Sequence, residues 1–132
     1  MAQIKIYGLR EYLDPIKPKL SDVIHSCVVE ALSYPPEKRF HRFFPLDAQD
    51  FYYPADRSPR YTIVEIGMFE GRSAEAKKRL FRLLFERVGE ELGLEPEDLE
   101  ITVTETPRHD WGIRGRPGDE LGLGYEVEAR KT

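Results

Sequence analysis

The sequence predicts an α+β domain in which two strand–helix–strand units form one mixed, largely four-stranded sheet with both helices on one face. Two helix-period stripes of apolar residues lie roughly sixty residues apart, and each is flanked by segments with strand-like patterning. Parallel strands joined by a helix are connected by a right-handed crossover, which places both helices on the same face. The 132 residues fit a single domain, 1–132.

The first unit consists of a short strand and a long helix. Residues 3–7 alternate polar and apolar side chains, which predicts a half-buried strand. The next apolar residues recur at spacings of three and four, as on one face of a helix. They are Ile16, Leu20, Val23, Ile24, Cys27, Val28, Ala31 and Leu32. We expect this helix to start near Asp14, with Pro18 in its first turn. The two prolines at 35–36 are expected to stop it.

The middle of the chain carries extended segments. The aromatic, proline-rich section 39–60 predicts short strands or an extended excursion rather than a helix. Segment 61–69 is almost continuously apolar, which predicts a central strand covered on both faces. Both helices cover one face of the sheet, so the other face is left open although this strand is apolar at Val64, Ile66 and Met68. Another subunit is the expected cover, and the pattern therefore predicts an oligomer.

The second unit repeats the order of the first. Ser73 is a suitable N-cap for the second helix, and Gly93 is a suitable residue just past its end. The inner face of that helix is expected to carry Ala76, Leu80, Leu83, Leu84 and Val88, widened by Phe81 and Phe85. Segment 99–103 alternates apolar and polar residues, which predicts a strand with one buried face. A last strand is expected through Tyr125 and Val127, after the glycine-rich region 112–124.

Composition narrows the function classes. The net charge of −4 gives no reason to expect a nucleic acid or an anionic membrane as a partner. The cytoplasm is the expected location. The sequence has a single cysteine, Cys27, no apolar run long enough to span a membrane and no signal-peptide pattern. No cofactor is expected, because region 112–124 lacks the order of a dinucleotide-binding loop. No metal is expected either, since the histidines lack metal-site spacing: His25, His41 and His109.

Four segments, in this order, together resemble the tautomerase superfamily, especially the branch with malonate semialdehyde decarboxylase and the cis-3-chloroacrylic acid dehalogenases. They are Tyr-Pro-Pro-Glu-Lys-Arg-Phe (34–40), Phe-Glu-Gly-Arg-Ser-Ala-Glu-Ala-Lys (69–77), Leu-Glu-Pro-Glu-Asp-Leu (94–99) and Asp-Trp-Gly-Ile-Arg-Gly (110–115). The resemblance covers nearly the whole chain. It implies a double strand–helix–strand subunit and a homotrimer in which three sheets pack around a central axis.

The catalytic group of that family is an amino-terminal proline, exposed when the initiator methionine is removed. Here Ala2 follows Met1. Removal of Met1 would leave a primary amine on Ala2, and an unperturbed α-amino group titrates near ~7.7–8.0. Burial or nearby cations could lower that value towards neutral pH, which a general base requires. Ala2 is therefore the candidate catalytic amine, in place of the family's proline.

The resemblance also implies residues that bind substrate. Arg72 matches the family's carboxylate-binding arginine, and a planar guanidinium just before a helix N-terminus suits an anion. The alternatives are a solvated charge or a salt bridge between subunits. A partner arginine of active relatives is replaced here by Phe69 or Glu70. A second charge would then come from elsewhere, such as Arg39, Arg114 or Arg116.

Two further positions match functional residues of malonate semialdehyde decarboxylase. Trp111 matches a tryptophan that helps to wall the pocket, with packing at a subunit contact as the alternative. Lys38 stands where that enzyme has a catalytic aspartate, so the resemblance does not carry decarboxylase activity over to this chain.

The sequence thus supports three functional hypotheses. The first is an isomerase that moves a proton on a small carboxylate-bearing 2-oxo or enol substrate through the Ala2 amine. The second is a catalytically silent oligomer that binds a small anion. The third is a structural or protein-binding role for the aromatic segment 39–60.

Overall fold

The computed structural model describes residues 1–122, and their element order is that of two strand–helix–strand units. The first unit comprises β1 (Ala2–Leu9), α1 (Arg10–Leu32) and β2 (His41–Leu46), and the second comprises β3 (Thr62–Phe69), α2 (Ala74–Leu92) and β4 (Leu99–Thr106). A short hairpin of β5 (Gly112–Ile113) and β6 (Arg116–Pro117) follows. The strand predicted through Tyr125 and Val127 lies outside the described residues.

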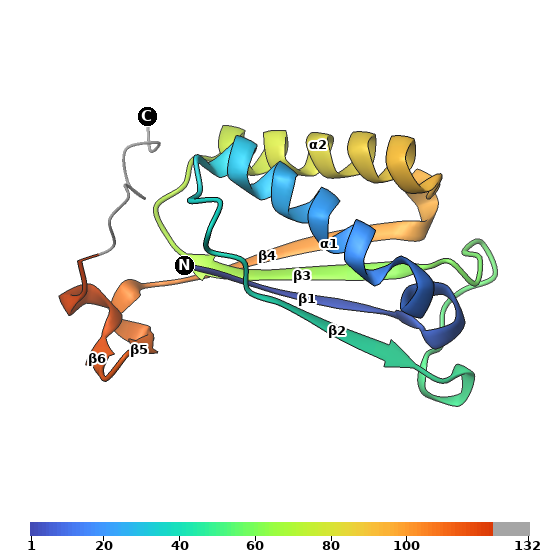
Figure 1. Ribbon diagram of the computed structural model, residues 1–132, viewed down its shortest axis with the longest axis horizontal. Helices are drawn as coiled ribbons and strands as arrows, with labels where there is room; N and C mark the ends of the chain where they lie inside the picture. The colour runs from blue at the N-terminus through green and yellow to red at the C-terminus, as the bar shows by residue number, and fades with distance from the viewer. Residues whose placement is uncertain (123–132) are drawn as a thin grey trace.

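The four long strands form one mixed sheet in the order β2-β1-β3-β4. Strands β1 and β2 pair in parallel, as do β3 and β4, whereas β1 and β3 pair antiparallel at the centre. Both helices lie side by side on one face of this sheet (Figure 1). The predicted α+β architecture of tandem strand–helix–strand units is confirmed.

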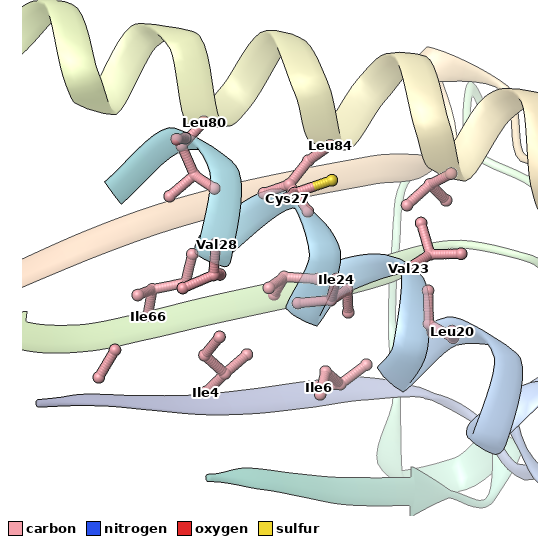
Figure 2. Packing of buried hydrophobic residues seen from close by; sticks show 14 of the residues in the cluster. Ile4, Ile6, Leu20, Val23, Ile24, Cys27, Val28, Ile66, Leu80 and Leu84 are labelled. Atoms are coloured by element: carbon pink, nitrogen blue, oxygen red, sulfur yellow. The ribbon is translucent and has the colours of Figure 1, made fainter. Parts of the chain in front are cut away.

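The hydrophobic core lies between the two helices and the sheet. Figure 2 shows the apolar stripe of α1 and the inner residues of α2 pointing towards β1 and β3. Fully buried members from all four elements include Ile6, Ile24, Ile66, Leu80 and Leu84. The predicted stripe of α1 and the inner residues predicted for α2 are confirmed, and Cys27 is a buried core residue. Phe85, which was predicted to widen the stripe of α2, is instead exposed.

The predicted placement of the apolar β3 residues is wrong. In the sheet register Ile66 lies opposite Ile4 and Val64 opposite Ile6, and all four side chains are buried in the core under the helices. Side chains alternate between the faces of a strand, so the other face carries the intervening positions. Those positions include Gln3, Lys5, Glu65, Thr102 and Thr104. The open face is therefore not the apolar surface from which we predicted an oligomer.

The predicted start of the first helix is also wrong. Helix α1 begins at Arg10, and both Pro15 and Pro18 lie inside it. Each proline removes one backbone hydrogen bond and clashes with the preceding turn, at a typical cost of ~3 kcal/mol. Tertiary packing opposes that cost, because Leu13 in the extra turns is fully buried and packs directly over Gly8. The positions of the prolines alone therefore led to a predicted helix start that lies too late in the sequence.

The ends of the helices agree with the predicted signals. The Ser73 hydroxyl accepts a hydrogen bond from the Ala76 amide at 3.1 Å, and Gly93 ends α2 with φ of 68°. Helix α1 ends at Ser33, which adopts the left-handed conformation with φ of 49°. Among the described residues, no helix combines the length and the apolar character needed to cross a membrane.

Candidate active site

The amino-terminus lies at the end of the sheet where β3 and β4 finish and where α1 ends and α2 starts (Figure 1). A small chamber is formed there. Its lining residues are Met1, Ala2, Leu32, Tyr34, Met68, Phe69 and Arg72. While Met1 is in place, the space between them is too narrow for a water molecule. The chamber brings together Ala2 and Arg72, which the sequence had singled out separately.

Ala2 is held by a tyrosine that the sequence analysis missed. The backbone nitrogen of Ala2 donates a hydrogen bond to the Tyr34 hydroxyl at 3.1 Å, and both residues are at least 96% buried. The left-handed turn at Ser33 directs Tyr34 into the chamber, and the Tyr34 amide donates to the Val29 carbonyl at 3.2 Å. Burial raises the pKa of Tyr34, so its hydroxyl stays protonated at neutral pH.

Arg72 is a buried wall residue of the chamber and not a solvated charge. It is 8% exposed, and its Nη1 donates to the carbonyl of Leu32, the last residue of α1. A positive charge at this point also complements the negative end of the helix dipole. Arg72 therefore connects the turn before α2 to the end of α1, two residues before Tyr34.

The electrostatic surroundings of the amino-terminus favour a neutral amine. Burial above all, and then the positive charges of Arg72, Lys38 and Arg108 in that order, together lower the pKa of the Met1 amino group from 8.0 to about 5. Within residues 1–122, the charges that shift this pKa have the same sign as the ammonium group. At neutral pH the amine is consequently a free base.

Arg108 is a second residue that the sequence analysis missed. It follows β4, and its guanidinium lies 5.6 Å from the centre of the Phe69 ring. Its Nη2 donates to the carbonyl oxygens of Gly118 at 3.1 Å and Leu121 at 2.9 Å. A side chain at Gly118 would collide with the Arg108 carbonyl, so the chain passes closely here. The parallel pairing of β3 and β4 brings Arg108 near the amine, and local patterning could not indicate that.

Trp111 packs on the Met1 side of the chamber. Its ring meets Phe69 edge-on, with centroids 5.0 Å apart, and its indole nitrogen donates to Thr106 Oγ1 at 2.9 Å. Trp111 and Ile113 pack against the buried pair Met1 and Phe69 in a small apolar cluster. Trp111 is not among the residues that line the chamber, so its predicted role as a wall of the pocket stays a prediction.

Arg39 and Arg114 do not line the chamber of their own chain. Arg39 Nη1 bonds Asp22 Oδ1 at 2.7 Å on the exposed side of α1. Arg114 is exposed in the turn between β5 and β6, with φ of 50°. Neither is among the charges that shift the pKa of the Met1 amine.

The histidines have local partners. His25 Nε2 lies 2.7 Å from the Pro36 carbonyl, and His41 Nδ1 lies 2.7 Å from Ser21 Oγ. Within residues 1–122, no group of three histidine, cysteine or acidic side chains is arranged to hold a metal ion.

Comparison with known proteins identifies the family. Residues 38–114 match the model of a family described as tautomerase enzymes. The probable tautomerase YrdN of Bacillus subtilis strain 168 is 30% identical over 100 residues, which cover 72% of this chain and 77% of the relative. The structure of FG41 malonate semialdehyde decarboxylase inhibited by 3-bromopropiolate matches with a TM-score of 0.75 and 26% identity, covering 93% of this chain and 91% of that one.

An R7 fused 4-OT, solved as an asymmetric trimer, matches with a TM-score of 0.79 at 20% identity and covers 92% of this chain and 99% of its own. That likeness shows the fold, whereas the family model and YrdN show kinship in sequence. The chain belongs to the tautomerase family.

Proposed function

We propose that the protein is a tautomerase that acts on a small carboxylate-bearing 2-oxo or enol compound, with the amino-terminal amine as the proton carrier. The observation that supports this most is the placement of the Ala2 nitrogen, 3.1 Å from Tyr34, in a chamber that Arg72 also lines. Base and anion anchor then lie on the walls of one small space.

The proposed reaction is a proton shift that needs no external oxidant or reductant. The neutral amine takes the proton from the enol hydroxyl, and the resulting ammonium returns a proton to the substrate carbon, so the amine ends unchanged. Arg72 pairs with the substrate carboxylate. Trp111 and Phe69 exclude water, which strengthens both electrostatic interactions.

Removal of Met1 is part of the proposal. Met1 is 9% exposed and packs against Phe69, so it occupies the space that a substrate needs. Once it is removed, Ala2 carries the amine. Because Ala2 is 4% exposed, and burial is the largest cause of the lowered Met1 pKa, we expect the pKa of the Ala2 amine to lie below its ordinary value as well.

We further propose a homotrimer, since the R7 fused 4-OT with this fold is a trimer. Arg39 and Arg114 lie outside the chamber of their own chain, so a role in substrate binding would require them to act across a subunit contact. Sedimentation tests the assembly: a clean monomer at micromolar concentration contradicts it.

The second candidate is a silent oligomer that binds a small anion. Ala2 in place of the family's proline and the chamber filled by Met1 favour it. In this case calorimetry with 2-oxo acids and dicarboxylates gives heat of binding without turnover. The absence of heat across such a panel counts against it.

Intact mass and an enol ketonisation assay separate the two candidates. Intact mass establishes whether Met1 is absent, and phenylenolpyruvate and 2-hydroxymuconate serve as generic probes. The proposal expects ketonisation faster than in buffer, and Ala2→Pro retains or raises the rate. Activity only in Ala2→Pro identifies a preserved but silent chamber. No activity in either protein overturns the proposed catalysis.

A further inference from the structure

The amine of Ala2 has a freedom that a proline lacks. The nitrogen of an amino-terminal proline is part of a ring, so the direction of its lone pair is fixed relative to the chain. A primary amine rotates about its bond to Cα among staggered positions, and only some of them point the lone pair at a substrate. A base of this kind needs a neighbouring group that selects one position.

Tyr34 lies where it can select one rotational position of the Ala2 amine. Its hydroxyl accepts the hydrogen bond of the Ala2 nitrogen at 3.1 Å, in surroundings where Tyr34 is 3% exposed. A neutral phenol oxygen has two acceptor lone pairs and can keep this bond to an amine N–H. We propose that Tyr34 is the positioning residue of the amine: its hydroxyl accepts a hydrogen bond from one N–H of Ala2 and thereby fixes the lone pair inside the chamber.

The partners of this hydrogen bond are both anchored independently of Met1. Tyr34 is held at the end of α1 by its own amide bond to Val29. Ala2 is held in β1, opposite Met68 in the central strand pair. Arg72 bonds the Leu32 carbonyl at the same helix end, so the anion anchor and the positioning residue share one rigid support. The bond between Ala2 and Tyr34 therefore persists when Met1 is removed.

The inference rests on the proposed function in taking the amine as the base. The alternative is structural: the hydroxyl only satisfies a buried backbone N–H, as buried polar groups require. The two roles differ in one respect. A positioning hydroxyl matters for an amine that can rotate and hardly matters for a ring nitrogen, whereas a structural hydroxyl matters equally for both.

A double-mutant cycle uses that difference. Tyr34→Phe is compared in the Ala2 protein and in Ala2→Pro, with ketonisation of phenylenolpyruvate as the assay and Met1 removal verified by intact mass. We expect kcat to fall about tenfold or more with Ala2 while KM changes little, and to fall less than about twofold in the proline background. Equal losses in the two backgrounds overturn the positioning role.

Tyr12→Phe is the matched control. The Tyr12 hydroxyl is also buried, has no hydrogen-bond partner within residues 1–122, and belongs to the first turns of α1. Tyr12→Phe should leave kcat within about twofold of the parent protein. A loss as large as that of Tyr34→Phe would attribute the effect to general loosening of the core and contradict the inference.

Titration of the amine tests Tyr34 without any need for activity. The fraction of amine acylated by a small reagent is measured against pH by intact mass in the parent protein and in Tyr34→Phe. The hydroxyl oxygen stabilises the ammonium form, so its loss should lower the pKa of the amine by about half a unit or more. An unchanged midpoint overturns the inference, whatever the activity. A lowered midpoint in a protein without tautomerase activity supports the Tyr34 contact and refutes only the proposed catalysis.

Discussion

The two ends of the sheet each contain a buried tyrosine with charged neighbours, but their charges are arranged differently. The amino-terminus and the β5–β6 hairpin lie at one end, and the loop between β2 and β3 lies at the other (Figure 1). At the loop end, Tyr61 donates to Glu100, and Arg57 pairs with the same carboxylate at 2.8 Å. At the amino-terminal end, the charges of the described part of the chain that shift the pKa of the amine are all positive.

The difference indicates which end serves stability and which serves chemistry. Opposite charges at the loop end satisfy one another and fasten the loop to β4. At the amino-terminal end, Arg72, Lys38 and Arg108 disfavour the charged form of the amine. Titratable groups perturbed in this way concentrate at functional sites. The comparison therefore supports the proposal that the amino-terminal end carries the function.

The largest expected effect is at Arg72. Arg72→Ala removes the proposed carboxylate anchor and should lower kcat/KM for enol ketonisation about 100-fold. Arg72→Lys keeps the positive charge but lacks the planar guanidinium, so its kcat/KM should lie between those of the parent protein and Arg72→Ala. The matched variant at the other end, Arg57→Ala, should leave kcat/KM unchanged. An Arg72→Ala protein that is folded by circular dichroism and retains the full rate would break the comparison.

A moderate effect is expected at Asp98, on the loop end. Asp98 is 4% exposed, and one of its carboxylate oxygens accepts a hydrogen bond from the Ser58 amide at 2.8 Å. Asp98→Ala should lower the free energy of unfolding by about 2 kcal/mol, because it leaves the partly buried amide and hydroxyl donors of Ser58 without their carboxylate partner. Urea unfolding measures this loss, and kcat/KM per folded molecule should not change. A loss of activity without a loss of stability would contradict the assignment of the two ends.

The smallest effect concerns His41, which lies near the amino-terminal end but has a structural setting. Burial lowers the pKa of His41 from 6.5 to about 4, helped by the nearby charges of His25 and Arg39. Between these values the unfolded chain takes up a proton that the folded chain does not. Stability should therefore be complete above pH 6.5 and should fall as the pH is lowered from 6.5 to 4.

The urea midpoint measured across this range in the parent protein and in His41→Gln checks the prediction. The parent slope should exceed that of the variant by less than the ~1.4 kcal/mol per pH unit of one full proton. Equal slopes would mean that His41 is not held neutral. An additional change in ketonisation rate would show that the amino-terminal site extends to β2.

Much of the fold could be predicted because it follows from local periodicity. The stripe of α1, the cap at Ser73 and the alternation of β4 all have sequence signals of their own. The sequence has no comparable signal for which side chains of β3 point to the helices, because a nearly continuous apolar strand fits either orientation. Only the register of β3 against Ile4 and Ile6 determines the orientation. The predicted start of α1 was wrong because the burial of Leu13 outweighs the cost of two prolines inside the helix.

The site was harder to predict than the fold. Ala2 and Arg72 carried signals through the family resemblance, and the chamber brings them together. Tyr34 was named only as the first residue of the segment 34–40 that resembles the family, and no role was predicted for it. The left-handed turn at Ser33 nevertheless directs it inwards. Arg108 comes near the amine only because β4 pairs with β3. Local sequence patterns carry no signal for a contact between residues so far apart in the chain.

The central claim is that the amino-terminal amine is a neutral base, and its titration in the parent protein tests this most directly. Intact mass first verifies that Met1 is absent, and pH-dependent acylation then gives the midpoint of the Ala2 amine. The account predicts a midpoint well below the ~7.7–8.0 of an unperturbed α-amino group, and a kcat/KM that rises with pH through that same midpoint. A midpoint at or above the ordinary value, or a rate that does not follow it, would contradict the account.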